Sequence, residues 1–411
     1  ETSGLLEISA FSINRFLVWM EVEQMRMTHW LEKRAQLTPD RMAVISEKSR
    51  LTFGELRAQS YLMANLLTVL GLQKDETVSF LCRNGVQVPI LMHAAAYLSL
   101  RVLPLNYRLT PREIAFQLRD SGAKFLLYDR SCSQLAQAVQ QLMPELKLET
   151  FESLQRENMH NEGNSRYSTH DLKATDLQTA IDMSSVYTIM YTSGTTGNPK
   201  GVLLTYGNHW SSAIGSVLNL GLGSDDVWLA CVPLFHISGL SIIMRSVIYG
   251  MPMIIHEKFD PTAVNQAIQS EGVTVISVVS KMLTRMLDDL GDGTYPDHFR
   301  CVLLGGGPAP LSLLEACVDK GIPVFQTYGL TETASQIVTL PPEYLLSKLG
   351  SAGKPLFLCD IRIMHDGVEA PAGTAGEIEV RGPNVTIGYL HQPEETSKVF
   401  RDGWFATGDI V

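Results

Sequence analysis

The feature that most constrains the fold is an alternation of helix-like and strand-like stretches along two long parts of the chain. The first part runs from Met27 to about Tyr128, and the second runs from Val186 to about Leu340. Helices between successive strands cover the faces of parallel sheets, so both parts predict α/β units. At 411 residues the chain is too long for one ordinary core. Short β-prone pieces from about Gly350 onward predict a small antiparallel or barrel-like unit.

The pattern also predicts where the elements lie. In the first part we expect helices at 30–35, 53–70, 86–98 and 111–121, and strands at 42–46, 77–81, 101–105 and 124–128. Residues from about 144 to 176 are polar and irregular, which predicts a surface linker. In the last part we expect β-prone pieces at 360–364, 376–381 and 386–390. We therefore divide the chain into an upstream segment (1–26), two α/β units (27–165 and 166–345) and a small β unit (346–411).

Composition narrows the class of protein. Hydrophobic residues make up 45% and charged residues 18%, as in a globular protein with a large core. The net charge of −10, without a basic stripe, argues against a nucleic-acid partner. The sequence contains no run of about 18 uncharged apolar residues, so it predicts no membrane-spanning helix. Six scattered cysteines without a Cys-x-x-Cys pair indicate reduced core thiols in a cytoplasmic protein.

One predicted βαβ unit shows how a pocket can form. A buried strand from Cys301 to Leu304 ends in the glycines 305–307, and a helix follows at about 310–320. The next strand, 323–327, ends at Tyr328 and Gly329. A parallel crossover places both strand ends on one edge of the sheet, where ligands of open α/β sheets bind. We expect Gly305, Gly306, Gly307, Tyr328 and Gly329 to face one crevice. Alternatively, the glycines form an ordinary loop and Tyr328 belongs to the core.

A loop rich in hydroxyl groups follows the β-prone run Val186 to Met190. It contains Thr192, Ser193, Gly194, Thr195, Thr196, Gly197 and, just beyond, Lys200. Free backbone N–H groups, short hydroxyl donors and one mobile cation are suited to a polyphosphate. The loop is not a Walker A motif, because no Gly-Lys-Ser/Thr closes it. A plain flexible turn is the alternative.

The string from Tyr191 to Gly201 resembles the phosphate loop of the adenylate-forming enzymes, which include acyl-CoA synthetases, luciferases and peptide-synthetase adenylation domains. Two later segments, 326–333 and 404–409, resemble motifs of the same superfamily in the same order. The resemblance implies the fold of that superfamily's large N-terminal domain. It also implies ATP and Mg²⁺ as cofactors and coenzyme A as a co-substrate.

The resemblance further implies residue roles. Tyr328 would pack on adenine, with Gln326 or Thr327 near its amino group, and Asp409 would accept hydrogen bonds from the ribose hydroxyls. Thr331 would contact the α-phosphate, and Glu332 would ligate Mg²⁺. Taken alone, Glu332 is equally an acid at a helix N-terminus, and Thr-Gly-Asp is equally a turn.

Four other segments, 206–209, 303–310, 335–340 and 348–356, resemble the 2-succinylbenzoate–CoA ligases of menaquinone synthesis. The resemblance implies a homo-oligomer that acts on a small-molecule carboxylate. In the superfamily the histidine of the Pro233–Gly239 motif borders the acyl pocket, which implies that role for His236, with Ser238 beside it. A structural histidine is the alternative.

A substrate with two carboxylates keeps one of them charged in the pocket, which requires a cation or several polar donors. Arg245 follows the Pro233–Gly239 motif by six residues on a helix-like segment, 240–249. His236 and Ser335 are further candidates. Arg245 is equally read as a solvated helix residue.

The sequence stops at Val411, two residues after Asp409, whereas the superfamily continues into a mobile domain that carries a catalytic lysine. We therefore expect this polypeptide to bind ATP and acyl-AMP but to form thioester slowly. A ligase for another aryl, fatty or amino acid and a binding domain without turnover are the alternatives.

Overall fold

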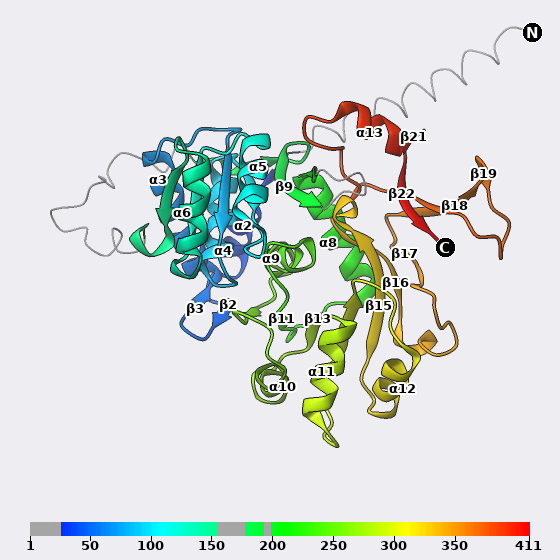
Figure 1. Ribbon diagram of the computed structural model, residues 1–411. Helices are drawn as coiled ribbons and strands as arrows, with labels where there is room; N and C mark the ends of the chain where they lie inside the picture. The colour runs from blue at the N-terminus through cyan, green and yellow to red at the C-terminus, as the bar shows by residue number, and fades with distance from the viewer. Residues whose placement is uncertain (1–25, 155–176, 193–198) are drawn as a thin grey trace, which may run out of the picture.

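The computed structural model describes residues 26–154, 177–192 and 199–411. The described part contains three large sheets and a two-stranded pair, β1 (Arg26–Thr28) with β8 (Ala180–Asp182) (Figure 1). The predicted upstream segment lies outside the described residues, apart from Arg26, which begins β1. Within the described part no helix has the length and apolar character to cross a membrane.

The first large sheet has six strands in the order β10-β9-β5-β4-β6-β7. Its strands are β4 (Thr77–Leu81), β5 (Arg101–Pro104), β6 (Phe125–Tyr128), β7 (Lys147–Thr150), β9 (Val186–Thr192) and β10 (Lys200–Thr205). All neighbours are parallel except β9 and β10. The helices of this part of the chain are α2 (Trp30–Leu37), α3 (Phe53–Val69), α4 (Gln87–Tyr97), α5 (Pro111–Asp120) and α6 (Ser133–Leu142).

The second large sheet has nine strands in the order β17-β16-β15-β14-β13-β11-β12-β2-β3. They are β2 (Met42–Ser46), β3 (Arg50–Thr52), β11 (Trp228–Ala230), β12 (Met253–Ile255), β13 (Val275–Val279), β14 (Cys301–Gly305), β15 (Val324–Leu330), β16 (Ser335–Leu340) and β17 (Lys354–Pro355). Its helices are α8 (Tyr206–Leu220), α9 (Ile237–Tyr249), α10 (Pro261–Ser270), α11 (Ser280–Leu290) and α12 (Leu311–Asp319). The central strands from β2 to β15 are parallel, and both edges end in antiparallel pairs.

The third sheet is wholly antiparallel, in the order β19-β18-β20-β22-β21. It consists of β18 (Asp360–His365), β19 (Val368–Glu369), β20 (Glu377–Arg381), β21 (Phe400–Arg401) and β22 (Trp404–Ile410), with α13 (Pro393–Val399) before β21. The predicted fold class, two α/β parts with a small β unit, is confirmed. Three short 3₁₀ helices complete the described elements: η1 (Arg130–Cys132), η3 (Thr331–Thr333) and η4 (Pro342–Tyr344).

Two predictions of local structure are wrong. Part of the predicted linker forms β7, which pairs in parallel with β6 at the edge of the first sheet, so its polar composition reflects one-sided exposure. Residues 155–176 of that linker lie outside the described residues. The expected strand at 386–390 is irregular, because Gly388 has a φ of +135° and interrupts the extended backbone.

The sheet that a strand joins does not follow from its position along the chain. β2 comes early but pairs with β12 in the nine-stranded sheet, whereas β9 and β10 come late but extend the six-stranded sheet. The sheets therefore cross the predicted boundary between residues 165 and 166. Alternation of element types predicts strands and helices, but it does not say which sheet a strand joins.

Helix starts are encoded locally, and one of them also shapes the site. The side chain of Thr205 accepts a hydrogen bond from the backbone N–H of Asn208, and Oδ1 of Asn208 accepts one from the backbone N–H of Thr205. Such reciprocal bonds satisfy N–H groups that a helix start leaves free. The Asn208 amide also donates to the carbonyls of Pro383 and Val385. The start of α8 thus anchors the segment between β20 and α13 of the small β unit.

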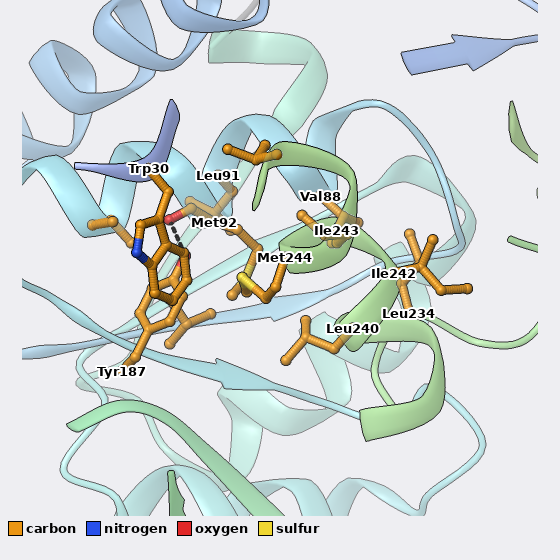
Figure 2. Close-up of a cluster of buried hydrophobic side chains, with 14 of the residues drawn as sticks. Trp30, Val88, Leu91, Met92, Tyr187, Leu234, Leu240, Ile242, Ile243 and Met244 are labelled. Atoms are coloured by element: carbon orange, nitrogen blue, oxygen red, sulfur yellow. Dashed lines mark hydrogen bonds between the residues drawn. The ribbon is translucent and has the colours of Figure 1, made fainter. Parts of the chain in front are cut away.

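A shared hydrophobic core joins the first two sheets. Leu91 and Met92 of α4 and Ile243 and Met244 of α9 belong to one cluster of buried side chains (Figure 2). The hydroxyl of Tyr187, on β9, donates to the carbonyl of Met92 at 2.7 Å. Because close-packed interiors resist small displacements, α9 is held firmly between the sheets.

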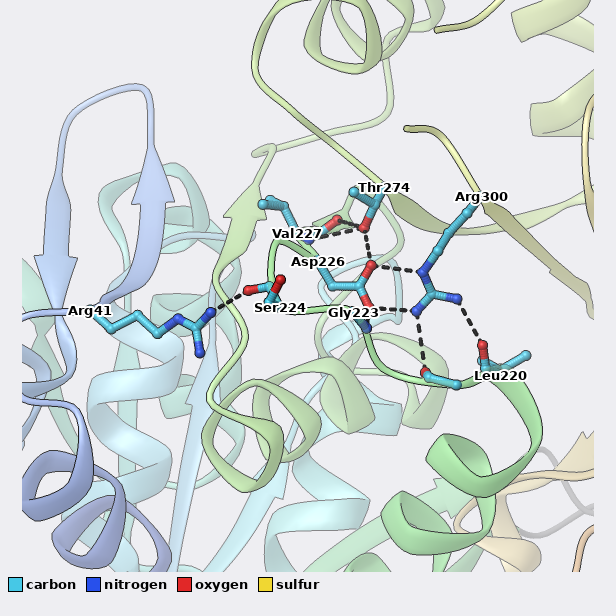
Figure 3. A network of polar contacts seen from close by, with 9 residues as sticks. Arg41, Leu220, Gly223, Ser224, Asp226, Val227, Thr274 and Arg300 are labelled. Atoms are coloured by element: carbon cyan, nitrogen blue, oxygen red, sulfur yellow. Dashed lines mark hydrogen bonds and ion pairs between the residues drawn. The ribbon is translucent and has the colours of Figure 1, made fainter. Parts of the chain in front are cut away.

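A buried ion pair fixes the C-terminal end of α8. Arg300 contacts both carboxylate oxygens of Asp226 and donates to the carbonyls of Leu220 and Gly221 (Figure 3). Thr274 donates to Asp226 at 2.9 Å. Burial raises the pKa of Asp226, but the bonds from Arg300, Gly223 and Thr274 outweigh that effect and lower it. The end of α8 is thereby joined to the residues that immediately precede β11, β13 and β14 of the second sheet.

We predict that Asp226→Ala lowers the free energy of unfolding by about 3 kcal/mol, because Arg300 loses its charge partner. This is the low end of the usual range, since the Arg300 side chain keeps 31% exposure. In the parent, the stabilisation is fully present above the ordinary Asp pKa of 3.8 and is lost as the pH falls through the lower folded value.

Urea unfolding at pH 7 measures the difference, and Asp225→Ala, at an exposed neighbouring position, is the control. Equal stabilities of the two variants would contradict a stabilising role for this ion pair.

Candidate functional site

A cavity of about 840 Å³ opens at the carboxyl ends of β13, β14 and β15. Val279, Gly305 and Thr327 line it from these strand ends. The remaining wall comes from β10, the start of α9, η3 and the third sheet. Parallel pairing of β14 with β15 brings Gly305, Gly306 and Gly329 to the same space, as the crossover predicted.

At one end of the cavity, the two residues predicted to hold adenine and ribose, Tyr328 and Asp409, contact each other. The hydroxyl of Tyr328 donates to Oδ2 of Asp409 at 2.7 Å, and Asp409 is exposed at the cavity wall. Burial and the neighbouring Asp409 raise the pKa of Tyr328, so the phenol stays protonated and donates. The prediction that Tyr328 and Gly307 face this crevice is wrong, because neither residue lines the cavity.

The other two residues of this strand end have different roles. Gln326 is off the cavity wall, and its side-chain Oε1 is buried without a hydrogen-bond partner. Thr327 lines the cavity while its hydroxyl donates to the Val338 carbonyl at 2.8 Å. The predicted contact of Gln326 with a ligand amino group is therefore not supported by the cavity, whereas Thr327 borders it.

Gly329 allows the chain to turn tightly into the next loop. A Cβ added at this position would lie 1.9 Å from the carbonyl oxygen of Ser335. Strands β15 and β16 also shift register between Tyr328 and Gly329. Ala334 and Ser335 both have positive φ angles, +51° and +102°. These are strained conformations for residues with a side chain, and such strain concentrates at functional sites.

The loop after Gly329 carries two of the predicted phosphate and metal residues into the cavity. Thr331 and Glu332 lie on η3 and line the cavity, as do Thr192 at the end of β9 and Lys200 at the start of β10. Ser193, Gly194, Thr195, Thr196 and Gly197 lie outside the described residues, so their phosphate role stays a prediction.

Lys200 and Glu332 are each held by residues that the sequence did not suggest. Lys200 Nζ lies 2.8 Å from Oε2 of Glu395 and 5.1 Å from the ring centroid of Tyr389. The Tyr389 hydroxyl donates to Oε1 of Glu332 at 3.0 Å. Burial raises the pKa of Glu332, although the bond from Tyr389 and the charge of Lys200 act in the opposite direction. Lys200 and Lys398 lower the pKa of Glu395 to about 2.

The opposite end of the cavity is formed by α9 and β16. His236 and Ser238 line it at the start of α9, and Ser335 lines it from β16. Burial and the nearby Arg108 lower the pKa of His236, which favours the neutral imidazole. The helix begins at Ile237, three residues before the predicted start.

Arg245 is a buried residue of the cavity wall, so the reading of it as a solvated helix residue is wrong. It is 1% exposed, and its guanidinium lies 5.0 Å from the Trp228 ring centroid. One nitrogen, Nη2, donates to Oε1 of Gln336 at 3.2 Å, whereas Nε is buried without a partner. No described acidic side chain pairs with it, and burial lowers its pKa. The guanidinium is therefore a charge with unfilled hydrogen-bonding capacity.

Sequence reasoning missed Tyr389, Glu395 and Gln336. Tyr389 falls in a stretch read as a strand, and nothing in its neighbours indicates the contact with Glu332. Gln336 was part of a recognised segment, but no role followed from it. Its side chain accepts from Ser216 at 3.1 Å as well as from Arg245, and it donates to Thr339 at 3.0 Å.

These observations define an α/β protein in which Lys200, Glu332, Asp409 and the buried guanidinium of Arg245 line one cavity. The chain belongs to the AMP-binding enzyme family, whose model matches residues 31–390. It is 51% identical to a 2-succinylbenzoate–CoA ligase of Geobacillus kaustophilus, over 93% of this chain and 74% of that protein. It is 46% identical to the corresponding ligase of Bacillus anthracis, over 93% and 75%.

Solved structures of 2-succinylbenzoate–CoA ligase and related proteins are also similar to this chain. The o-succinylbenzoate CoA synthetase of Bacillus subtilis, in complex with its acyl-adenylate intermediate, superposes with a TM-score of 0.86 at 42% identity and covers 94% of this chain and 76% of that one. The N-terminal domain of FACL13 from Mycobacterium tuberculosis, bound to an inhibitor, has a TM-score of 0.84 at 30% identity, over 93% and 96%. Both likenesses extend over nearly all of this chain.

Proposed function

We propose that this protein is an AMP-forming acid–thiol ligase that converts 2-succinylbenzoate to 2-succinylbenzoyl-CoA in menaquinone biosynthesis. Family membership and the ligases at 46–51% identity support the reaction class and the substrate. The observation that carries the choice of acid is Arg245, a buried guanidinium without a carboxylate partner in the cavity wall.

The reaction has two steps. A carboxylate oxygen of the acid attacks the α-phosphorus of ATP, the bond to the bridging oxygen breaks, and pyrophosphate leaves. The thiol of coenzyme A then attacks the acyl carbon, loses its proton, and releases AMP. Catalysis of the first step depends on positioning and on neutralising phosphate charge, which the cations and N–H groups of such a site provide.

We assign this chain's residues to the ends of the substrate from their positions on the cavity wall. We place the ribose hydroxyls on Asp409 and adenine at the strand ends that carry Gly305 and Gly329, next to the Tyr328–Asp409 hydrogen bond. Thr192, Thr331 and Lys200 would contact the phosphates. His236 and Ser238 would border the path of the acyl group, which ends at Arg245.

Glu332 fits a magnesium ion that is held mainly by its nucleotide. The described residues contain no group of three or more His, Cys, Asp or Glu side chains that could hold a metal ion. Mg²⁺ typically binds through one or two carboxylates together with phosphate oxygens and water. When bound, the ion neutralises phosphate charge and orients the triphosphate.

The family resemblance also supports a proposal about the cellular compartment and the oligomeric state. We propose that the protein acts in the cytoplasm and as a homo-oligomer. Size-exclusion chromatography with light scattering tests the second statement directly.

A ligase for a fatty acid is the second candidate, because a fatty acyl CoA synthetase of Mycobacterium tuberculosis has a similar fold, with a TM-score of 0.83 at 29% identity. A fatty acyl chain has no second charge, so a buried guanidinium in its pocket would be destabilising. Pyrophosphate exchange with a panel of carboxylates tests the proposed function and its rival. The 2-succinylbenzoate should support exchange and long-chain fatty acids should not, whereas the reverse order would favour the rival.

We predict that Asp409→Ala lowers the affinity for ATP about ten- to a hundredfold without unfolding the protein. The lost hydrogen bonds involve a charged acceptor and are worth roughly 1.5–3 kcal/mol. Calorimetric titration measures the affinity, with Asp319→Ala on the surface of α12 as the charge-matched control. An unchanged affinity in the folded Asp409 variant would remove this residue from the nucleotide site.

We predict that Arg245→Met weakens binding of a nonhydrolysable 2-succinylbenzoyl-adenylate analogue about ten- to a hundredfold. An analogue without the ring carboxylate should lose at most a few-fold, because it has no charge for Arg245 to bind. Arg401→Met, at another part of the cavity wall, should change both affinities by the same factor. Equal losses for both ligands in the folded Arg245 variant would refute the pairing.

A further inference from the structure

Tyr389 contacts two functional groups of the cavity at once. It is 8% exposed and lines the cavity from the irregular segment 386–390. Its hydroxyl donates to Oε1 of Glu332 at 3.0 Å. The ammonium of Lys200 lies over its ring, 5.1 Å from the centroid. A single side chain therefore links the carboxylate at the metal position to the lysine at the phosphate position.

The backbone around Tyr389 is bonded to both of the elements that it links. The N–H of Thr386 donates to the Glu332 carbonyl at 2.7 Å, and the N–H of Leu390 donates to the Gly201 carbonyl at 2.8 Å. The N–H of Tyr389 itself donates to the Thr396 hydroxyl at 3.0 Å. These bonds set the height of the ring above β10 and its distance from η3. The side chain has little freedom to leave either partner.

Each contact leaves its partner ready for a ligand. The phenol occupies one carboxylate oxygen of Glu332, and no other described side chain is hydrogen-bonded to that carboxylate. The second oxygen is then directed by the first, because the carboxylate is planar. The ring face favours a cation above it, since aromatic faces are electron-rich. Glu395 holds the same ammonium from the side at 2.8 Å.

We propose that Tyr389 is a positioning residue that holds Glu332 for Mg²⁺ through its hydroxyl and Lys200 for the phosphates through its ring. This inference rests on the proposed function, because it deepens the roles of the same two residues. The two contacts use different parts of the side chain, so they can be removed separately. Tyr389→Phe removes the hydroxyl and keeps the ring, whereas Tyr389→Leu removes both.

The test is calorimetric binding of ATP to the full chain, with and without Mg²⁺. For Tyr389→Phe we expect the metal-free affinity within about twofold of the parent, and a Mg²⁺ concentration for half-maximal enhancement that is raised about tenfold. For Tyr389→Leu we expect the same change in Mg²⁺ dependence together with a metal-free affinity lowered about two- to fivefold. Tyr344→Phe, at an exposed position on η4, is the matched control and should behave as the parent.

A merely structural role would not change the Mg²⁺ dependence of ATP binding while leaving the metal-free affinity of Tyr389→Phe nearly unchanged. Parent-like Mg²⁺ dependence in Tyr389→Phe, or equal losses with and without Mg²⁺ in both variants, would overturn the proposal. Glu332→Gln separates this inference from the proposed function. If Glu332→Gln leaves Mg²⁺ dependence unchanged, the metal role in the proposed function is wrong. If Glu332→Gln abolishes the Mg²⁺ dependence and Tyr389→Phe does not alter that dependence, only the positioning role of Tyr389 is wrong.

Discussion

The geometry of the cavity depends on the hydrogen bonds that join segment 386–390 to η3 and to β10. One bond reaches the carbonyl of Glu332 from Thr386, and another reaches the carbonyl of Gly201 from Leu390. β10 belongs to the six-stranded sheet, whereas η3 follows a strand of the nine-stranded sheet. The segment therefore brings together two residues that the sheets alone would leave unrelated, Lys200 and Glu332. The packed core of α4 and α9 holds the sheets together, and these bonds set the site between them.

Charge is distributed in the cavity according to what each end would bind. Lys200, at the proposed phosphate end, pairs with Glu395 and lies near Glu332, whose pKa burial raises. Arg245, at the proposed acyl end, has no acidic partner among the described residues. An overall charge of −10 does not oppose an anionic substrate, because a buried cation acts over a few ångströms in a medium of low dielectric constant. A buried guanidinium is costly when unpaired, so the arrangement favours a ligand that brings its own carboxylate.

The sequence predicted what is local and could not predict what is distant. The bounds of β2 were correct because five consecutive residues carry the strand pattern, but its partner β12 lies far along the chain, so its sheet was not predictable. The crevice at Gly305 and Gly329 followed from the parallel direction of the two strands, which brings their carboxyl ends to one edge of the sheet. Arg245 was found by its chemistry, yet its burial depends on Trp228 and Gln336. Tyr389 was missed because its partners come from two other elements.

The most direct test of this account compares two nonhydrolysable acyl-adenylates in calorimetric titrations of the unmodified chain. One carries the 2-succinylbenzoyl group and the other a straight-chain fatty acyl group, so the nucleotide contacts are the same. The account predicts that the 2-succinylbenzoyl compound binds about ten- to a hundredfold more tightly, because its ring carboxylate meets a buried guanidinium. Equal affinities, or tighter binding of the fatty acyl compound, would contradict it.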